Sequence, residues 1–482
     1  MRRVISLVTL ITLISTVFSA GRAVAQPGVA GRWEGSISIL GTQLGIVVVL
    51  TPEGSNYKAT IDIPQQGAKG MQLTNVRVDA TKVHFELPAG PGLAVFDGEL
   101  KDGVISGKFE QSGLAGTFDL KRPAAGATPA TPAAPAAPVP PPPYNQEEVT
   151  IKSGTVTLAG TLTLPASGTP SPAVVMITGS GAQNRDEEIF GFKIFRVIAD
   201  HLTRRGIAVL RMDDRGVGGS SGSTSQSTTA DFADDALAGV RWLQGRSDID
   251  RKRVGLMGHS EGGLVAPMLA ARSSDIAFII LMSGPGLTGE QIMLAQSELV
   301  GRPAGRTDDQ IRRNQDIQRK MFASVRSGTG WDEVGAMIRS EIKAAIDALP
   351  EAQRKAIGDV EKLAEAQVKG QLDAVRTPWF RFFLDFDPAT VLEKVRCPVL
   401  VLFGEHDVQV PAGPNRAAIE KAFARGGLKT YRIEVFPRAN HLYQDSETGG
   451  VGEYATLKKE FVPGFLDLLS TWIDQQTGIT TR

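Results

Sequence analysis

Ser260 stands in the sequence Gly-His-Ser-Glu-Gly-Gly at 258–263 and has small neighbours on both sides. An apolar run at 253–257 precedes it and a helical pattern follows, so the segment predicts a strand, a sharp turn and a helix. The strained backbone of such a turn tolerates only small residues two positions either side of the serine, and Gly258 and Gly262 meet that demand. The turn would hold the serine hydroxyl outside the edge of a sheet, where a base can make it a nucleophile.

Five histidines could supply that base. We favour His441, which lies in the loop after the last expected strand, with Asp407, in the loop after the preceding strand, as its partner. Functional groups of an open parallel sheet gather outside the carboxyl ends of its strands, where Ser260 is also expected. The chain order is then nucleophile, acid and base. His441 would take the serine proton, and Asp407 would orient its ring and stabilise the imidazolium. Glu405 is the alternative acid.

The charge that develops on a substrate carbonyl oxygen needs hydrogen-bond donors. The backbone N–H of Glu261, directly after the serine, is the first candidate. The second is the backbone N–H of Ser180, in the glycine-rich loop after an expected strand at 173–177. Gly179 in this loop allows the backbone to approach a ligand closely, so we expect it at the substrate pocket.

The pattern Gly-x-Ser-x-Gly occurs a second time, around Ser220 at 218–222. This copy lies in a stretch rich in Gly, Ser and Thr at 216–229, with no helical run directly after the serine. Such a composition is typical of a loop. The surrounding pattern therefore favours Ser260 over Ser220 as the nucleophile.

The chain has 482 residues, with 52 basic and 52 acidic side chains. Residues 1–25 combine a positive start, an apolar stretch and an Ala-Val-Ala site, the pattern of a secretory signal peptide cleaved after Ala25. An uncleaved membrane anchor is the alternative. We expect an exported protein of the periplasm or the extracellular space, without a membrane span after cleavage. The balanced charge does not indicate binding to nucleic acid, and no pattern indicates an oligomeric state.

The remaining chain divides by composition. Residues 27–122 contain short alternating strands with turn signals and predict a small all-β barrel or sandwich domain, antiparallel in its pairing. We favour a structural or docking role for it over ligand binding. An Ala/Pro-rich linker at 123–146 cannot bury a core and is expected to be an extended spacer. From 147 to 482, strands and helices alternate, which predicts an α/β domain with a mainly parallel sheet and helices on both faces.

A charge-rich, helical insertion at about 285–385 interrupts this alternation and predicts a helical cap over the carboxyl ends of the strands. Trp379, Phe382, Phe383 and Phe386 have helical spacing within it and should share one face. That face would dock the cap on the sheet domain. Alternatively, Trp379 and Phe382 line a substrate pocket.

Three motifs carry a resemblance to a known family. They are Thr-Gly-Ser-Gly at 178–181, Asp-Asp-Arg-Gly-Val-Gly-Gly-Ser at 213–220 and the hexapeptide at 258–263. Together they resemble the α/β-hydrolase superfamily, and most closely its bacterial secreted esterases, in the branch shared with serine aminopeptidase-like and acyl-CoA thioesterase-like members. Trp379 to Phe383, before Asp385, is similar to that group as well. The resemblance covers about residues 145–480 and implies an α/β-hydrolase fold.

The sequence thus predicts an exported serine esterase that cleaves small-molecule carboxylic esters through an acyl-enzyme at Ser260. A serine peptidase or aminopeptidase, or a thioesterase, of the same fold is the alternative within enzymes. A binding module of the cell envelope that uses the N-terminal β domain is the alternative outside them. No metal-spaced cluster or phosphate-cradling loop is present, so we expect no cofactor and no metal. Arg215 should hold its loop by pairing with a carboxylate, and the charged residues at 185–188 should form a solvated loop.

Overall fold

The computed structural model describes residues 28–478, apart from short gaps and residues 124–141. The short gaps are 40–41, 55, 64–67, 89–92, 112–113, 167–169, 303–304, 352–353, 355–356 and 358. The expected signal peptide at 1–25 and most of the expected linker lie outside the described residues. The first strand after that linker begins at Tyr144, within the range assigned to the linker.

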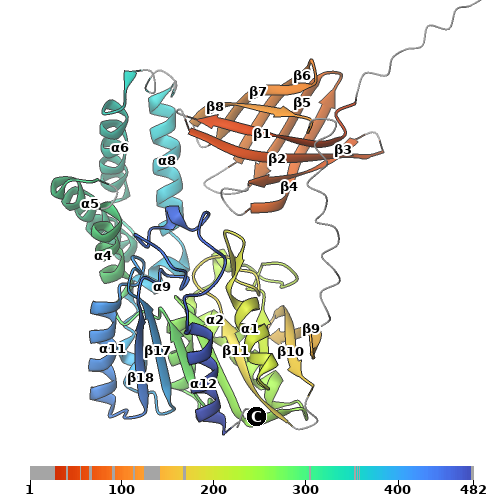
Figure 1. Cartoon of the computed structure of the whole chain (residues 1–482). Coiled ribbons are helices and arrows are strands. Elements are labelled where there is room, and N and C mark those ends of the chain that lie inside the picture. The colour runs from red at the N-terminus through yellow and green to blue at the C-terminus, as the bar shows by residue number, and fades with distance from the viewer. Residues whose placement is uncertain are drawn as a thin grey trace, which may run out of the picture.

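The N-terminal domain is a closed barrel of eight strands, each paired antiparallel to its neighbours (Figure 1). The first strand pairs with both the second and the eighth, which closes the sheet. Of the two architectures expected, barrel and sandwich, the barrel is correct. Its strands are β1 Gly31–Ile39, β2 Thr42–Glu53, β3 Asn56–Ile63, β4 Ala68–Asp79, β5 Lys82–Pro88, β6 Leu93–Lys101, β7 Val104–Gln111 and β8 Leu114–Lys121.

Aromatic and aliphatic side chains fill the middle of this barrel. The Phe85 and Phe96 rings stack at 4.7 Å, and Phe118 meets both rings edge-on. Trp33 is fully buried beside them and donates from its indole N–H to the Val29 carbonyl at 2.8 Å. An eight-stranded barrel is only wide enough for its own side chains or for one small ligand. Here the described side chains occupy that space as an apolar core.

The second domain is built on an eight-stranded sheet in the order β18-β17-β16-β15-β11-β14-β10-β9. Strands β9 and β10 form an antiparallel hairpin, β10 also pairs antiparallel with β14, and the other pairs are parallel. The mainly parallel sheet expected from the alternating pattern is confirmed. Its strands are β9 Tyr144–Ser153, β10 Val156–Pro165, β11 Ser171–Ile177, β14 Ala208–Met212, β15 Ile249–His259, β16 Ile279–Met282, β17 Val399–Gly404 and β18 Tyr431–Phe436.

Helices cover both faces of the sheet (Figure 1). Side chains of α1 and α12 pack on one face with Met257 and Phe278, and those of α2, α3 and α11 pack on the other with Leu256 and Val401. The helices are α1 Ile194–Arg204, α2 Thr229–Gln244, α3 Gly262–Ala270, α11 Ala412–Gly426 and α12 Phe465–Thr477. The short elements are β12 Glu188–Ile189, β13 Phe192–Lys193, α10 Ala389–Leu392, and the 3-10 helices η2 Thr224–Gln226 and η3 Val451–Glu453.

The insertion between β16 and β17 is helical, as expected, and has an apolar core of its own around Phe322 and Phe380. A capping box starts one of its helices, because the Thr307 hydroxyl and the Gln310 side chain each accept from the other's backbone N–H. Its helices are α4 Gly289–Gly301, α5 Asp308–Ser327, α6 Trp331–Asp347, α8 Val360–Val375 and α9 Pro378–Asp385. Among the described residues, no helix is long and apolar enough to cross a membrane.

Candidate active site

The turn between β15 and α3 holds Ser260 in the left-handed region, at φ +52°. A non-glycine residue rarely adopts this conformation, and here the surrounding structure enforces it. The Ser260 N–H donates to the Met282 carbonyl of β16 at 2.8 Å. A Cβ atom on Gly258 would lie 1.9 Å from the Gly262 carbonyl oxygen, and one on Gly262 would lie 2.2 Å from that of Ile177. The two glycines therefore permit the strained turn.

His441 and Asp407 come together at the carboxyl ends of the last two strands. His441 Nδ1 lies 2.8 Å from Asp407 Oδ2, and both residues are buried. The other oxygen, Asp407 Oδ1, accepts the backbone N–H groups of Gln409 and Val410 at 2.9 and 2.8 Å. These bonds fix the carboxylate and hence the imidazole. Glu405, the alternative acid, instead accepts the Arg438 backbone N–H at 2.9 Å.

Ser260 and His441 line the same cavity, which has a volume of about 390 Å³. Among the described residues, no hydrogen bond joins the two side chains. Contacts between a nucleophile and its base are often looser in ligand-free enzymes, so the arrangement is compatible with proton transfer once a substrate is bound. The structure thus brings Ser260, Asp407 and His441 together from three separate loops.

The glycine-rich loop after β11 passes directly beside the serine. A Cβ atom on Gly179 would lie 3.2 Å from the Ser260 Cβ, so this approach favours glycine. Ser180 and Glu261 both line the cavity, and neither backbone N–H donates a hydrogen bond to any described residue. Both amides are therefore available to an oxygen at the serine.

A buried ion pair, not recognised in the sequence, lies below this loop. Glu187 and His259 are 0 % and 1 % exposed, and Glu187 Oε1 lies 2.8 Å from His259 Nδ1. The same oxygen accepts the Gly179 N–H at 2.7 Å. His259 Nε2 lies 3.0 Å from the His441 carbonyl oxygen. The expectation of a solvated loop at 185–188 is wrong for Glu187, because the loop folds this carboxylate inward against two hydrogen-bond donors.

Apolar side chains from the cap form much of the cavity wall, among them Ile292, Met293 and Phe383. Trp379 also lines it, stacks on Phe383 at 5.2 Å and donates its indole N–H to Glu261 Oε1 at 2.7 Å. Phe382, which was expected beside Trp379 in the pocket, is not among the described lining residues. It stacks on Phe386 at 5.3 Å. The two i,i+4 aromatic pairs therefore do not act as one face.

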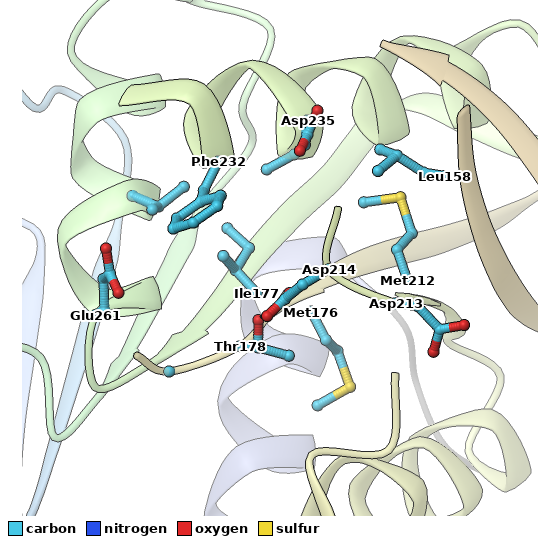
Figure 2. A pocket seen from close by; sticks show the side chains of 13 residues that line it. Leu158, Met176, Ile177, Thr178, Met212, Asp213, Asp214, Phe232, Asp235 and Glu261 are labelled. Atoms are coloured by element: carbon cyan, nitrogen blue, oxygen red, sulfur yellow. The ribbon is translucent and has the colours of Figure 1, made fainter. Parts of the chain in front are cut away.

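A second, smaller cavity shares Gly179 and Glu261 with the first, and the carboxyl groups of Asp213, Asp214, Asp235 and Glu261 belong to its lining (Figure 2). Asp214 accepts the Thr178 hydroxyl at 2.6 Å and the Gln183 backbone N–H at 2.9 Å. Burial raises the pKa of Asp214 to about 7, although these bonds oppose the shift. Burial also raises the pKa of Glu261, against the hydrogen bonds from Thr229 and Trp379.

The Ser220 hydroxyl makes two hydrogen bonds to the backbone. It donates to the Asp213 carbonyl at 2.8 Å and accepts the Ala159 N–H at 2.9 Å, which fastens the loop to β10. Arg215 in the same loop pairs with Asp235 at 2.7 and 2.8 Å, as expected from the sequence.

Within the described part of the chain, no group of three or more His, Cys, Asp or Glu side chains could hold a metal ion.

A profile of the alpha/beta hydrolase family matches residues 174–451, more than half of the chain. Esterase EstD of Thermotoga maritima is 26% identical over 304 residues, and the match covers 63% of this chain and 61% of EstD, less than two thirds of that relative. The solved esterase Pf2001 of Pyrococcus furiosus aligns with a TM-score of 0.40 at 16% identity, over 70% of this chain and 92% of its own. Proline iminopeptidase of Mycobacterium smegmatis aligns with a TM-score of 0.40 at 17% identity, over 68% of this chain and 98% of its own. On the family match and its own sheet topology, this chain belongs to the alpha/beta hydrolase family.

Proposed function

We propose that this protein is a serine hydrolase that cleaves carboxylic esters. The observation that carries the proposal is a strained, cavity-facing Ser260 opposite an imidazole whose other nitrogen is held by Asp407. A serine hydroxyl reacts as a nucleophile only when a positioned base takes its proton, and His441 fits that role. The likeness to an esterase, EstD, supports the same reaction class.

In the first half of the reaction, Ser260 Oγ bonds to the ester carbonyl carbon while its proton passes to His441 Nε2. The carbonyl oxygen becomes an oxyanion, which accepts hydrogen bonds from the Ser180 and Glu261 amides. The tetrahedral intermediate collapses, the bond to the alkoxy oxygen breaks, and His441 returns the proton to the leaving alcohol. In the second half, water attacks the acyl-enzyme by the same proton transfers and releases the carboxylic acid.

The cavity wall favours a neutral ester with an apolar acyl group. The described lining residues include no Lys or Arg, and both ring nitrogens of His259 already have partners, so the phosphates of a coenzyme A thioester would meet no available cation there. Their only carboxylates belong to Glu187 and Glu261. In each, one oxygen is hydrogen-bonded and the other is buried away from solvent, so neither carboxylate presents an accessible oxygen to the amine of an aminopeptidase substrate.

The experiment that tests the reaction class combines active-site labelling with a substrate panel. A fluorophosphonate should label the protein, Ser260→Ala should abolish labelling, and Ser220→Ala should leave it unchanged. A series of p-nitrophenyl esters should be hydrolysed, whereas aminoacyl anilides should be turned over at least about tenfold less efficiently. Labelling that survives Ser260→Ala would exclude the proposed nucleophile, and faster turnover of the anilides would make the protein a peptidase.

We also infer export, which the pattern of residues 1–25 supports. Cleavage after Ala25 would remove Arg2, Arg3 and Arg22 and no acidic residue. The test is N-terminal sequencing of the protein recovered from the periplasm and medium of an expressing bacterium. A first residue of Gln26 is expected, and recovery only from the cytoplasm with residues 1–25 intact would exclude export.

A further inference from the structure

The buried pair of Glu187 and His259 engages both ring nitrogens of the histidine. Both ring nitrogens of His259 face acceptors, the Glu187 carboxylate at 2.8 Å and the His441 carbonyl oxygen at 3.0 Å. A neutral imidazole donates from one nitrogen only, so opposite an ionised Glu187 carboxylate both bonds are made by an imidazolium. Burial by itself would lower the pKa of His259, but the Glu187 carboxylate and the carbonyl raise it.

These bonds form one continuous path across the site. It runs from the Gly179 N–H to Glu187 Oε1, then from His259 Nδ1 to the same oxygen, and from His259 Nε2 to the His441 carbonyl. One end is next to Ser180, a proposed oxyanion donor, and the other end is the backbone of the proposed base. The middle is the residue directly before Ser260. The pair therefore connects the three loops whose relative position decides the reaction.

Stability alone does not explain this arrangement. Removing two charges from water is unfavourable, and a buried ion pair is often no more stable than apolar residues of the same volume. Glu187 also holds a left-handed backbone at φ +46°, and its Oε2 atom is buried without a partner among the described residues. Strained and under-bonded groups persist where the surrounding structure fixes them, and they cluster at functional sites.

We propose that Glu187 and His259 are positioning residues that set the distance between the oxyanion donors and His441. The inference rests on the proposed function, because it assigns the pair a task within that reaction. Glu187 holds the loop that carries Ser180, and His259 holds the His441 backbone against the same carboxylate. Loss of the charge would leave each loop folded but free to shift, and small misplacements of catalytic groups are costly in the transition state.

The test is Glu187→Gln, which keeps the size of the side chain and an oxygen for the Gly179 N–H but removes the charge. We expect kcat for a p-nitrophenyl ester to fall about 10- to 100-fold, with KM changed less than about threefold. Phenylboronic acid, which forms a tetrahedral adduct with an active serine, should bind Glu187→Gln more weakly by the same factor. A purely structural role would reduce the fraction of active protein and leave the Kd of that fraction unchanged. Glu188→Gln is the matched control, because Glu188 is 30 % exposed and lies 3.3 Å from Lys193.

Three outcomes are distinguishable. If Ser260→Ala eliminates hydrolysis and Glu187→Gln behaves like Glu188→Gln, the positioning pair is excluded and the proposed function stands. If Ser260→Ala retains hydrolysis, the proposed function itself fails. Should Glu187→Gln not fold, His259→Gln decides in its place, because it breaks the same path. An unchanged kcat and boronate Kd in that variant overturns the inference, and parallel losses in both support it.

Discussion

Two turns in this protein share the pattern Gly-x-Ser-x-Gly and use the serine in opposite ways. Ser220 is 8 % exposed, and its hydroxyl is engaged with two backbone groups, the Asp213 carbonyl and the Ala159 N–H. Ser260 lies at φ +52° and lines the cavity, and its hydroxyl makes no hydrogen bond to the described residues. The pattern itself therefore does not make a serine a nucleophile. What matters is whether the backbone leaves the hydroxyl free for a base.

Replacing Ser260 or Ser220 with alanine tests directly which of the two hydroxyls reacts. Ser260→Ala should lower kcat/KM for a p-nitrophenyl ester by at least about 10⁴-fold, because the attacking atom is lost. Ser220→Ala should change that rate less than about threefold. It should instead lower the free energy of unfolding by about 1–3 kcal/mol, because the Ala159 N–H loses its partner. Steady-state kinetics and urea unfolding of both variants measure the two effects.

The kinetic and the unfolding measurements control for each other. Each variant is expected to change one quantity and to leave the other near the wild-type value. A large rate loss in Ser220→Ala at unchanged stability would mean that the second turn takes part in the reaction. A Ser260→Ala protein that retains its activity would remove the distinction between the two turns altogether.

The sequence was sufficient for features that depend on local periodicity. The strand before Ser260 and the helix after it both follow from patterns of a few residues. Glu187 was missed because nothing in the run of charged residues at 185–188 distinguishes the one that turns inward. Its burial depends on Gly179 and His259, whose donors approach it only in the folded chain. Phe382 was misplaced because helical spacing could not show which aromatic pairs stack together.

Two adjacent aspartates hold the loops of the two turns and differ in the direction of their pKa shifts. Asp213 supports the Ser220 turn and bonds to Arg185, whose hydrogen bonds lower the pKa of Asp213 although burial opposes them. Asp214 supports the loop beside Ser260 and bonds to neutral donors, so burial raises its pKa to about 7. A carboxyl group with a raised pKa in the folded chain binds its proton more tightly there than in the unfolded chain. Its contribution to stability is complete below the ordinary value of 3.8 and is lost as the pH rises to about 7.

The wild-type protein should therefore lose stability between about pH 4 and pH 7, and Asp214→Asn should lose less over the same range. The upper bound of the effect is about 4 kcal/mol, at roughly 1.4 kcal/mol per pKa unit. Urea unfolding at intervals across this range measures it. Asp213→Asn is the control with the opposite sign, because a lowered pKa stabilises the fold above about pH 4, and that variant should lose stability at neutral pH. Equal slopes for Asp214→Asn and the wild-type protein would show that Asp214 does not retain its proton in the folded chain.

The glycines of the two turns are expected to differ in their contribution to the free energy of unfolding by about 2 kcal/mol. In Gly258→Ala, the new Cβ would lie 1.9 Å from the backbone oxygen of Gly262, which the turn cannot displace without moving Ser260. In Gly219→Ala, the new Cβ would lie 2.7 Å from the Ala159 side chain, at a position that is exposed to solvent. We expect losses in the free energy of unfolding of about 3 kcal/mol for Gly258→Ala and about 1 kcal/mol for Gly219→Ala. Only Gly258→Ala should also abolish fluorophosphonate labelling, because only the turn between β15 and α3 holds a reactive hydroxyl in place. Gly258→Ala protein that is labelled at the wild-type rate would show that the turn can relax without moving the serine.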